Sequence, residues 1–276
     1  MTHPIIESSS MSQAWRHWLS SPAGAYLLDW EQKKIDDLVS DIFGYHALQL
    51  GMPELEGLRT NRMPHKWLAA DDLNVERVHK AFDLSAHSVA LPFQADSLDL
   101  LVMPHSLELS LDAHASLREA HRVLVPEGHL VITGLNPTSL FGWRHKRSQW
   151  YQKWGYSGLS APPVDELIAY WRLKDWLGLL GFEVKVSHFG CWRPAMDKAS
   201  WLSRWSWLDT WGAKWWPILG GTYALVAVKK VQGGRIVGVS WKARRSHAKS
   251  AVSVAQRQVS PSGTNSLQRE NEFESR

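Results

Sequence analysis

Residues 91–137 read LPFQADSLDLLVMPHSLELSLDAHASLREAHRVLVPEGHLVITGLNP, and this stretch decides the fold class. Leu98–Met103 is an apolar run broken by a single aspartate, which is typical of a short parallel strand buried on both faces. From Asp112 to Leu124 the apolar residues recur at helical spacing, and Asp112 is placed to cap the helix. His129–Leu135 reads as a second strand. The stretch therefore predicts one right-handed strand–helix–strand unit of a parallel sheet, whose ligands bind at the carboxyl ends of the strands.

Further elements flank this unit on both sides. Helical periodicity predicts helices over residues 14–19, 23–42 and 164–180. Short β-rich runs predict strands over residues 45–50, 65–70, 182–189 and 223–229. Helices and strands in this order predict an α/β protein.

Three separated motifs lie in register with these elements: Leu91-Pro92-Phe93, Leu98-Asp99 and the run RVLVPEG at residues 122–128. Together they resemble the class I S-adenosylmethionine-dependent methyltransferases, specifically the type 11 methyltransferase domain. The resemblance implies a doubly wound, mostly parallel seven-stranded sheet of the Rossmann-like methyltransferase fold, closed by an antiparallel hairpin. It also implies S-adenosyl-L-methionine as the cofactor and methyl transfer to a small molecule as the activity.

The loop after the first strand departs from the family pattern. The family carries an acidic residue there, followed by Gly-x-Gly-x-Gly. This chain has Gln49 at the acidic position, Gly51 at the first glycine, and Pro53 and Leu55 at the other two. Glycine allows positive φ and a close backbone approach to a ligand, whereas proline offers neither positive φ nor an N–H. Because S-adenosylmethionine has no pyrophosphate, one glycine is compatible with binding, and the resemblance assigns cofactor contacts to Gln49 and Gly51.

Four more residues are expected near the cofactor from their places in the family pattern. Asp71, or Asp72 beside it, is placed directly after the second strand to accept hydrogen bonds from the ribose hydroxyls, and two solvated loop aspartates are an equal alternative. His87 and Ser88 precede Leu91-Pro92-Phe93, where relatives often place an acid near the adenine. Pro104 ends the next strand at the same edge of the sheet.

Two further residues are candidates for the chemistry. Methyl transfer is an in-line displacement, so the protein mainly aligns the reactants and excludes water. His105 and Glu108 follow Pro104 at the carboxyl end of its strand, where the donor methyl would point. We expect His105 to act as a base or to orient the acceptor, and a packed structural histidine is the alternative. Cys191 is the single cysteine, and the remaining histidines and acids show no metal-ligand spacing, so no metal is expected.

The positive charge of the chain is concentrated at its carboxyl end. Residues 229–276 hold ten Lys or Arg against three Glu, net +7, which leaves −3 for residues 1–228 of a chain whose net charge is +4. The core is therefore not expected to bind nucleic acid. We divide the chain into amino-terminal helices that cover the core (1–44), a methyltransferase-like domain (45–230) and a basic tail of disordered composition (231–276). With one cysteine and no apolar run long enough to span a bilayer, the protein is expected to be cytoplasmic.

Seven of the 17 tryptophans fall between Trp192 and Trp216, inside a segment expected to be an insertion over residues 192–218. Projected as one helix, six of them occupy an arc wider than half the circumference, interrupted by Arg204 and Asp209. Packing on the core is one interpretation of this arc. A lid over a hydrophobic substrate or a peripheral patch on a membrane is the other, since tryptophan suits places where one side is apolar and the other wet.

Two functions are compatible with the sequence. One is an S-adenosylmethionine-dependent methyltransferase that acts on a small, hydrophobic or lipid-like molecule. The other is a catalytically inactive methyltransferase-like binding or regulatory module, which the degenerate glycine loop favours. The sequence leaves the acceptor, the methylated atom and the oligomeric state open.

Overall fold

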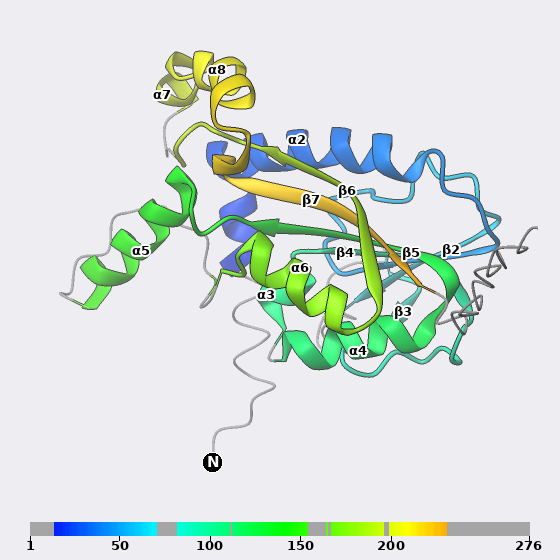
Figure 1. The fold of residues 1–276 in the computed structure, drawn as a ribbon. Coiled ribbons are helices and arrows are strands. Elements are labelled where there is room, and N and C mark those ends of the chain that lie inside the picture. The colour runs from blue at the N-terminus through cyan, green and yellow to red at the C-terminus, as the bar shows by residue number, and fades with distance from the viewer. Residues whose placement is uncertain are drawn as a thin grey trace, which may run out of the picture. The chain divides into compact units, whose positions relative to one another are not determined.

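The computed structural model describes residues 14–70, 82–110, 112–153, 164, 167–195 and 199–230. Its centre is a seven-stranded sheet in the order β3-β2-β1-β4-β5-β7-β6 (Figure 1). Strands β1 to β5 pair in parallel, and β7 runs antiparallel to both β5 and β6. The predicted doubly wound, mostly parallel seven-stranded sheet with an antiparallel hairpin at its end is confirmed.

Most predicted elements are found within a few residues of their expected bounds. The strands are β1 (His46–Leu50), β2 (His65–Ala70), β3 (Leu84–Ser85), β4 (Leu98–Pro104), β5 (Leu124–Leu135), β6 (Phe182–Gly190) and β7 (Thr222–Lys229). The helices are α2 (Pro22–Val39), α3 (Ser106–Leu109), α4 (Ala113–Val123), α5 (Leu140–Lys153), α6 (Tyr170–Leu179), α7 (Ala199–Arg204), α8 (Trp207–Trp215) and the short 3₁₀ helix η2 (Pro217–Leu219). Residues 14–19 are also helical.

Helices cover both faces of the sheet. Helix α2 lies along one face, and α4 and α6 lie along the other (Figure 1). Strand β4 packs against both layers, because Leu101 and Met103 belong to the hydrophobic cluster that includes α4 and α6, whereas Leu100 and Val102 belong to the cluster that includes α2. Successive side chains of a strand point to opposite faces, so burial on both faces explains the continuous apolar run.

One side chain ties the sequence motifs together. Arg122 of α4 donates hydrogen bonds to the backbone carbonyls of Leu91 (3.1 Å) and Phe93 (2.9 Å), and it forms an ion pair with Glu119. Glu119 in turn accepts a hydrogen bond from the Leu91 N–H at 2.8 Å. The turn that leads toward β4 is thereby fastened to α4, which gives a physical reason why these motifs occur together.

Two predicted boundaries differ from the structure. The helix predicted from Val164 begins at Tyr170, because Ala169 at its N-cap has extended backbone. The strand predicted from His129 begins at Leu124, directly after α4, because its first residue already pairs with β4.

The tryptophan-rich insertion also differs from the prediction. It forms two short helices, α7 and α8, because the chain turns at residues 205–206. The projection of this segment as one continuous helix is therefore wrong. Helices α5, α7 and α8 lie at one end of the sheet, the end toward which β5 points (Figure 1).

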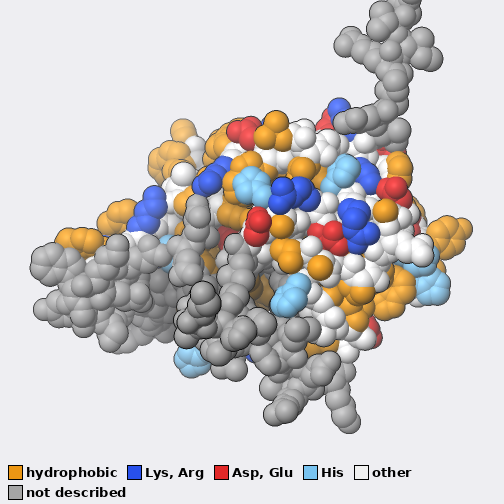
Figure 2. All heavy atoms as spheres, turned by 90° about the horizontal axis from the view of Figure 1, so that it is seen from below, with side chains coloured by type: hydrophobic (Ala, Val, Ile, Leu, Met, Phe, Trp, Pro, Cys, Tyr) orange, Lys and Arg blue, Asp and Glu red, His pale blue; other side chains and the backbone are white. Residues whose placement is uncertain are grey.

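The surface over α4 and α6 is mixed in character. Hydrophobic, basic, acidic and histidine side chains lie interspersed on it (Figure 2). None of the helices that the structure describes combines the length and apolarity needed to span a bilayer.

Candidate functional site

The strand order places a topological switch point between β1 and β4. The chain runs outward from β1 to β2 and β3, and then returns to the other side of β1 with β4. Strands β1 and β4 are parallel, with Gln49 opposite Val102, so Gly51 and His105 follow neighbouring strands at the same edge. Ligands of open α/β sheets bind in the crevice at such a switch point. The carboxyl ends of β1 and β4 are therefore the candidate site.

Gly51 leaves open space at this edge. Its φ is +74°, a left-handed conformation that glycine adopts without strain. Its N–H donates to the Ala69 carbonyl of β2 at 2.7 Å, which fixes the backbone. In the described part of the chain, a Cβ atom added to Gly51 would meet only the Ser106 Oγ within 4 Å, at 3.9 Å. The glycine backbone is thus open to a ligand on the side that faces the end of β4.

Gln49 organises the loop that follows β1. Its side-chain Nε2 donates to the carbonyls of Gly51 (3.1 Å), Met52 (2.9 Å) and Leu55 (2.6 Å), and its Oε1 accepts from the Gly57 N–H at 2.8 Å. The side chain is buried. A carboxylate has no N–H to give to these three carbonyls, so the amide suits this loop conformation. Gln49 therefore supports the site by shaping the loop backbone.

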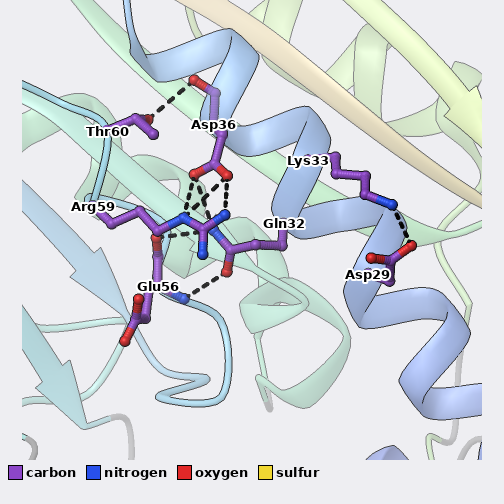
Figure 3. Close-up of polar contacts among 7 residues, drawn as sticks. All are labelled: Asp29, Gln32, Lys33, Asp36, Glu56, Arg59 and Thr60. Carbon is purple, nitrogen blue, oxygen red and sulfur yellow. Dashed lines mark hydrogen bonds and ion pairs between the residues drawn. The ribbon is translucent and has the colours of Figure 1, made fainter.

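The same loop is fastened from outside to helix α2. Gln32 accepts from the Glu56 N–H (2.9 Å) and donates to the Glu56 carbonyl (3.1 Å). Asp36 forms a forked ion pair with Arg59, and its backbone carbonyl accepts from the Thr60 hydroxyl (3.1 Å), as Figure 3 shows. The loop is held between the end of β1 and α2.

His105 lies at the end of β4 between two glutamates. Its Nδ1 is 2.7 Å from Glu108 Oε2, and its Nε2 is 2.8 Å from Glu31 Oε1 of α2. All three side chains are buried. Glu108 also accepts from the Leu135 N–H (2.6 Å), and Glu31 accepts from the Thr222 hydroxyl (2.8 Å). Through these contacts the cluster connects helix α2 with helix α3. It also connects both helices with the ends of strands β4 and β5 and with the first residue of β7.

The charges in this cluster favour a protonated histidine. Burial by itself lowers the pKa of His105, but the charge of Glu31 and the hydrogen bonds with both glutamates outweigh it and raise the pKa to about 10. Burial raises the pKa of Glu108 above its usual value, against the opposing effect of His105. Both ring nitrogens are engaged by carboxylates, and the raised pKa favours the protonated ring, which is less suited to act as a base than a neutral imidazole. The geometry favours the orienting role.

Comparison with known proteins places this fold in a family. The family described as "Methyltransferase domain" matches residues 65–132, which run from β2 into β5. A solved structure from Thermotoga maritima, described as a SAM-dependent methyltransferase and possible histamine N-methyltransferase, shares the fold with a TM-score of 0.52 and 14% identity. The likeness covers 74% of this chain and 92% of that one. Residues 65–132 thus match the methyltransferase domain family, and the chain shares the fold of a solved SAM-dependent methyltransferase.

Two curated proteins are similar to part of this chain. The uncharacterized protein YafS of Escherichia coli (strain K12) is 29% identical over 167 residues, which is 60% of this chain and 65% of YafS. The biotin biosynthesis bifunctional protein BioHC of Saccharophagus degradans (strain 2-40) is 30% identical over 135 residues, which is 48% of this chain and 24% of BioHC. The matched regions span less than two thirds of either relative's length.

The structure brings most of the predicted methyltransferase site residues to one edge of the sheet: Gln49, Gly51, Pro104, His105 and Glu108. Leu55, at the position of the family's third glycine, is buried in the hydrophobic cluster that includes α2, so its side chain does not occupy the opening at Gly51. Within the described ranges, no group of three or more His, Cys, Asp or Glu side chains is arranged to hold a metal ion.

The residues predicted near the adenine lie before β4. Ser88 is buried, and its hydroxyl lies 3.3 Å from the Ser110 hydroxyl and 3.0 Å from the Ser116 hydroxyl. His87 is exposed. Asp71, predicted to contact the ribose, lies outside the described residues. Cofactor contacts of these three residues stay predictions.

Sequence reasoning missed Glu31 and Trp15. Glu31 stands in the apolar stripe of α2, four residues from both Leu27 and Ile35, and all three are buried. A charged residue inside such a stripe was the signal that could have identified it. Trp15 had no such signal; its ring centroid lies 4.9 Å from that of His105. Among the described residues, its indole N–H and Glu31 Oε2 have no hydrogen-bond partner although both atoms are buried.

Proposed function

We propose that this protein is an S-adenosylmethionine-dependent methyltransferase that acts on a small, hydrophobic acceptor. One observation carries the proposal: the open left-handed turn at Gly51 faces Ser106 across the switch point of a methyltransferase sheet. A ligand at this edge can contact the backbone after β1 and the first turn after β4 together. S-adenosylmethionine, when bound, supplies an electrophilic methyl group on a sulfonium.

The loop residues fit this cofactor. Gly51 offers space that a side chain would fill, and Leu55 is turned into the core. The hydrogen bonds of Gln49 and the clamp from α2 hold the loop in one conformation before a ligand arrives, which reduces the entropic cost of binding. The loop therefore keeps the required opening although two of the family's glycines are replaced.

We place the acceptor on the side of His105. The rings of Trp15 and Trp18 lie 5.3 Å apart between centroids, and the Phe141 ring lies 6.5 Å from that of Trp18. These buried aromatic side chains support a flat, apolar acceptor. The indole N–H of Trp15 and Glu31 Oε2 are suited to orient its polar end, because a buried polar atom without a partner gains from each hydrogen bond it makes.

A binding or regulatory module without catalysis is the second candidate. The raised pKa of His105 and its two contacts with glutamates favour it, because an acceptor that must lose a proton would not find a free imidazole at this position. An acceptor that already presents a lone pair needs no such base and is compatible with the enzyme. Both candidates bind the cofactor, and they differ only in whether the methyl group is transferred.

Isothermal titration calorimetry with S-adenosylmethionine and S-adenosylhomocysteine tests the proposal. We expect the wild type to bind both, and Gly51→Val to bind at least roughly tenfold more weakly, a loss of about 1.4 kcal/mol. The matched control is Gly178→Val, since Gly178 is exposed on α6 and an added Cβ would meet, among the described residues, no atom within 4 Å beyond its chain neighbours and its own helix backbone. Thermal melting of both variants separates lost binding from lost folding.

Release of S-adenosylhomocysteine in the presence of apolar alcohols and amines then separates the two candidates. Binding with turnover supports the enzyme, and binding without turnover across the panel supports the module. No binding by the folded wild type at millimolar ligand would refute both roles for this cofactor.

A further inference from the structure

Helix α8 of the insertion exposes its aromatic side. Trp207, Trp211 and Trp215 recur at four-residue spacing and therefore share one face of the helix. Their exposed fractions are 49%, 57% and 63%. An amphipathic helix of a globular protein normally packs its apolar face on the core, so this orientation is inverted.

The opposite side of α8 is fastened to the protein by polar and small residues. Tyr26 of α2 donates a hydrogen bond to Asp209, Arg193 forms an ion pair with Asp209 at 2.8 Å, and the Arg193 guanidinium lies 4.7 Å from the centroid of the Tyr26 ring. Gly212 is buried against Trp192, whose side chain leaves no room for a Cβ. The helix is held in place by Asp209 and Gly212, and this attachment directs the tryptophans outward.

More exposed tryptophans lie on other helices at this end of the sheet. Helices α5, α7 and α8 occupy the same end of the sheet (Figure 1). We define the tryptophan face as their exposed indoles: Trp143, Trp150, Trp201, Trp207, Trp211 and Trp215. The mixed surface over α4 and α6 differs from this concentration of one residue type (Figure 2).

Basic residues accompany the tryptophan face. Residues 140–153, which form α5, include four Lys or Arg and no Asp or Glu. The Arg147 guanidinium lies 4.7 Å from the centroid of the Trp143 ring, so charge and indole stand together. Residues 199–219 hold two basic residues and one acid, Asp209, which Arg193 already neutralises. The segments that carry these indoles therefore hold more basic than acidic residues.

We infer that the tryptophan face docks on the surface of an anionic phospholipid bilayer. Indole rings are favoured at the boundary between headgroups and acyl chains, and Lys and Arg are attracted to anionic headgroups. Partial exposure of a row of indoles on a helix suits insertion to headgroup depth, as in peripheral amphipathic helices. The candidate site lies at the same end of the sheet, so docking brings it close to lipid. This inference does not rest on the proposed methyl transfer.

Partition of the full-length protein onto vesicles tests the inference. Sedimentation with vesicles of phosphatidylcholine containing phosphatidylglycerol is compared with phosphatidylcholine alone. We expect binding to the anionic vesicles, and at least a roughly tenfold loss for the double variant Trp207→Gln/Trp211→Gln. The charge variant Lys146→Glu/Lys214→Glu should lose a similar factor on anionic vesicles, since each basic residue near an anionic surface adds to the attraction.

The matched control is Phe43→Gln/Tyr45→Gln. Phe43 and Tyr45 are exposed by 71% and 70% but precede β1, at the opposite end of the parallel strands. This variant should bind vesicles as the wild type does. Equal binding by the tryptophan variant and the wild type would overturn the inference, and so would an equal loss in the control. A wild type that ignores vesicles and self-associates through Trp207 and Trp211 would assign the face to a second copy of the chain instead.

Discussion

The Nε2 atom of His105 lies 2.8 Å from the Oε1 atom of Glu31, although the two residues are 74 positions apart in the chain. Glu31 comes from the helix that covers the sheet, and His105 follows the strand that forms half of the switch point. Both side chains are buried, so the contact is a buried pair that needs both partners. The covering helix and the candidate site are thereby linked through charge as well as through packing.

This contact makes stability depend on pH above neutrality. The pKa of His105 is raised from 6.5 to about 10 in the folded protein, so the folded state keeps a proton that the unfolded chain releases. The stabilisation is complete below pH 6.5 and is lost as the pH rises through about 10. We expect the free energy of unfolding, from urea titrations, to fall by at most about 1.4 kcal/mol per pH unit in this range. Glu31→Gln should flatten this slope, and Glu183→Gln, at a half-exposed position far from His105 in the sheet order, should not. Equal slopes in all three proteins would contradict the assignment.

Gln49→Glu should destabilise the loop after β1. The carboxylate would face the carbonyls of Gly51, Met52 and Leu55 without any N–H to donate. We expect a loss of about 2–5 kcal/mol in chemical unfolding, because a buried charge loses its hydration and three acceptors lose their donor. Gln94→Glu, at an exposed position, is the control. A variant as stable as the wild type would mean that this hydrogen-bond network does not hold the loop.

Exposed and buried tryptophans should respond differently to the same substitution. Trp207→Gln/Trp211→Gln should cost less than about 1 kcal/mol per site, because both rings are half exposed. Trp15→Gln should cost about 3–5 kcal/mol, because that ring is buried against His105. Thermal and urea unfolding measure both. A large loss in the double variant would show that its tryptophans belong to the core.

Asp209→Ala should loosen α8 while leaving the sheet intact. The substitution removes the acceptor of Tyr26 and the ion-pair partner of Arg193. Burial, followed by the interactions with Cys191 and Asp209, raises the pKa of Tyr26, so its hydroxyl stays protonated and able to donate. We expect faster hydrogen–deuterium exchange over residues 207–215 and a global loss of about 1–3 kcal/mol. Asp175→Ala, exposed on α6, should change neither; unchanged exchange in Asp209→Ala would contradict the anchoring role.

Deletion of residues 242–276 should leave the melting temperature nearly unchanged. This segment lies outside the described residues, and the prediction rests on its composition. It has few apolar side chains to offset an ordering cost of roughly 1–2 kcal/mol per residue. A fall of many degrees in differential scanning calorimetry would show that the segment packs on the domain.

The sheet was predictable because its signals are local. Strand β2 has the predicted bounds, and the apolar run of β4 required burial on both faces, which only a covered parallel strand provides. The position of Gly51 at the end of a strand was equally local. The short strand β3 escaped prediction, because two residues carry no periodicity.

The site was less predictable because its contacts join distant parts of the chain. The sequence pointed to His105 and Glu108 together, but nothing local indicated that Glu31 would occupy the other ring nitrogen. Gln49 looked like a lost acid, whereas the structure uses its amide as a donor to three loop carbonyls. A departure from a motif is visible in sequence, but its effect depends on what surrounds the side chain.

The sequence by itself determined the parallel sheet and the motifs of residues 91–128, because alternation, helical periodicity and motif spacing act over a few residues. The tertiary structure alone decided which side of α8 faces outward. Periodicity sets the angle of Trp207, Trp211 and Asp209 around the helix axis but not the side that meets the core. That side was selected by Tyr26, 183 residues before Asp209, and by Arg193, because partly burying the carboxylate is favourable only where a donor and a cation already stand.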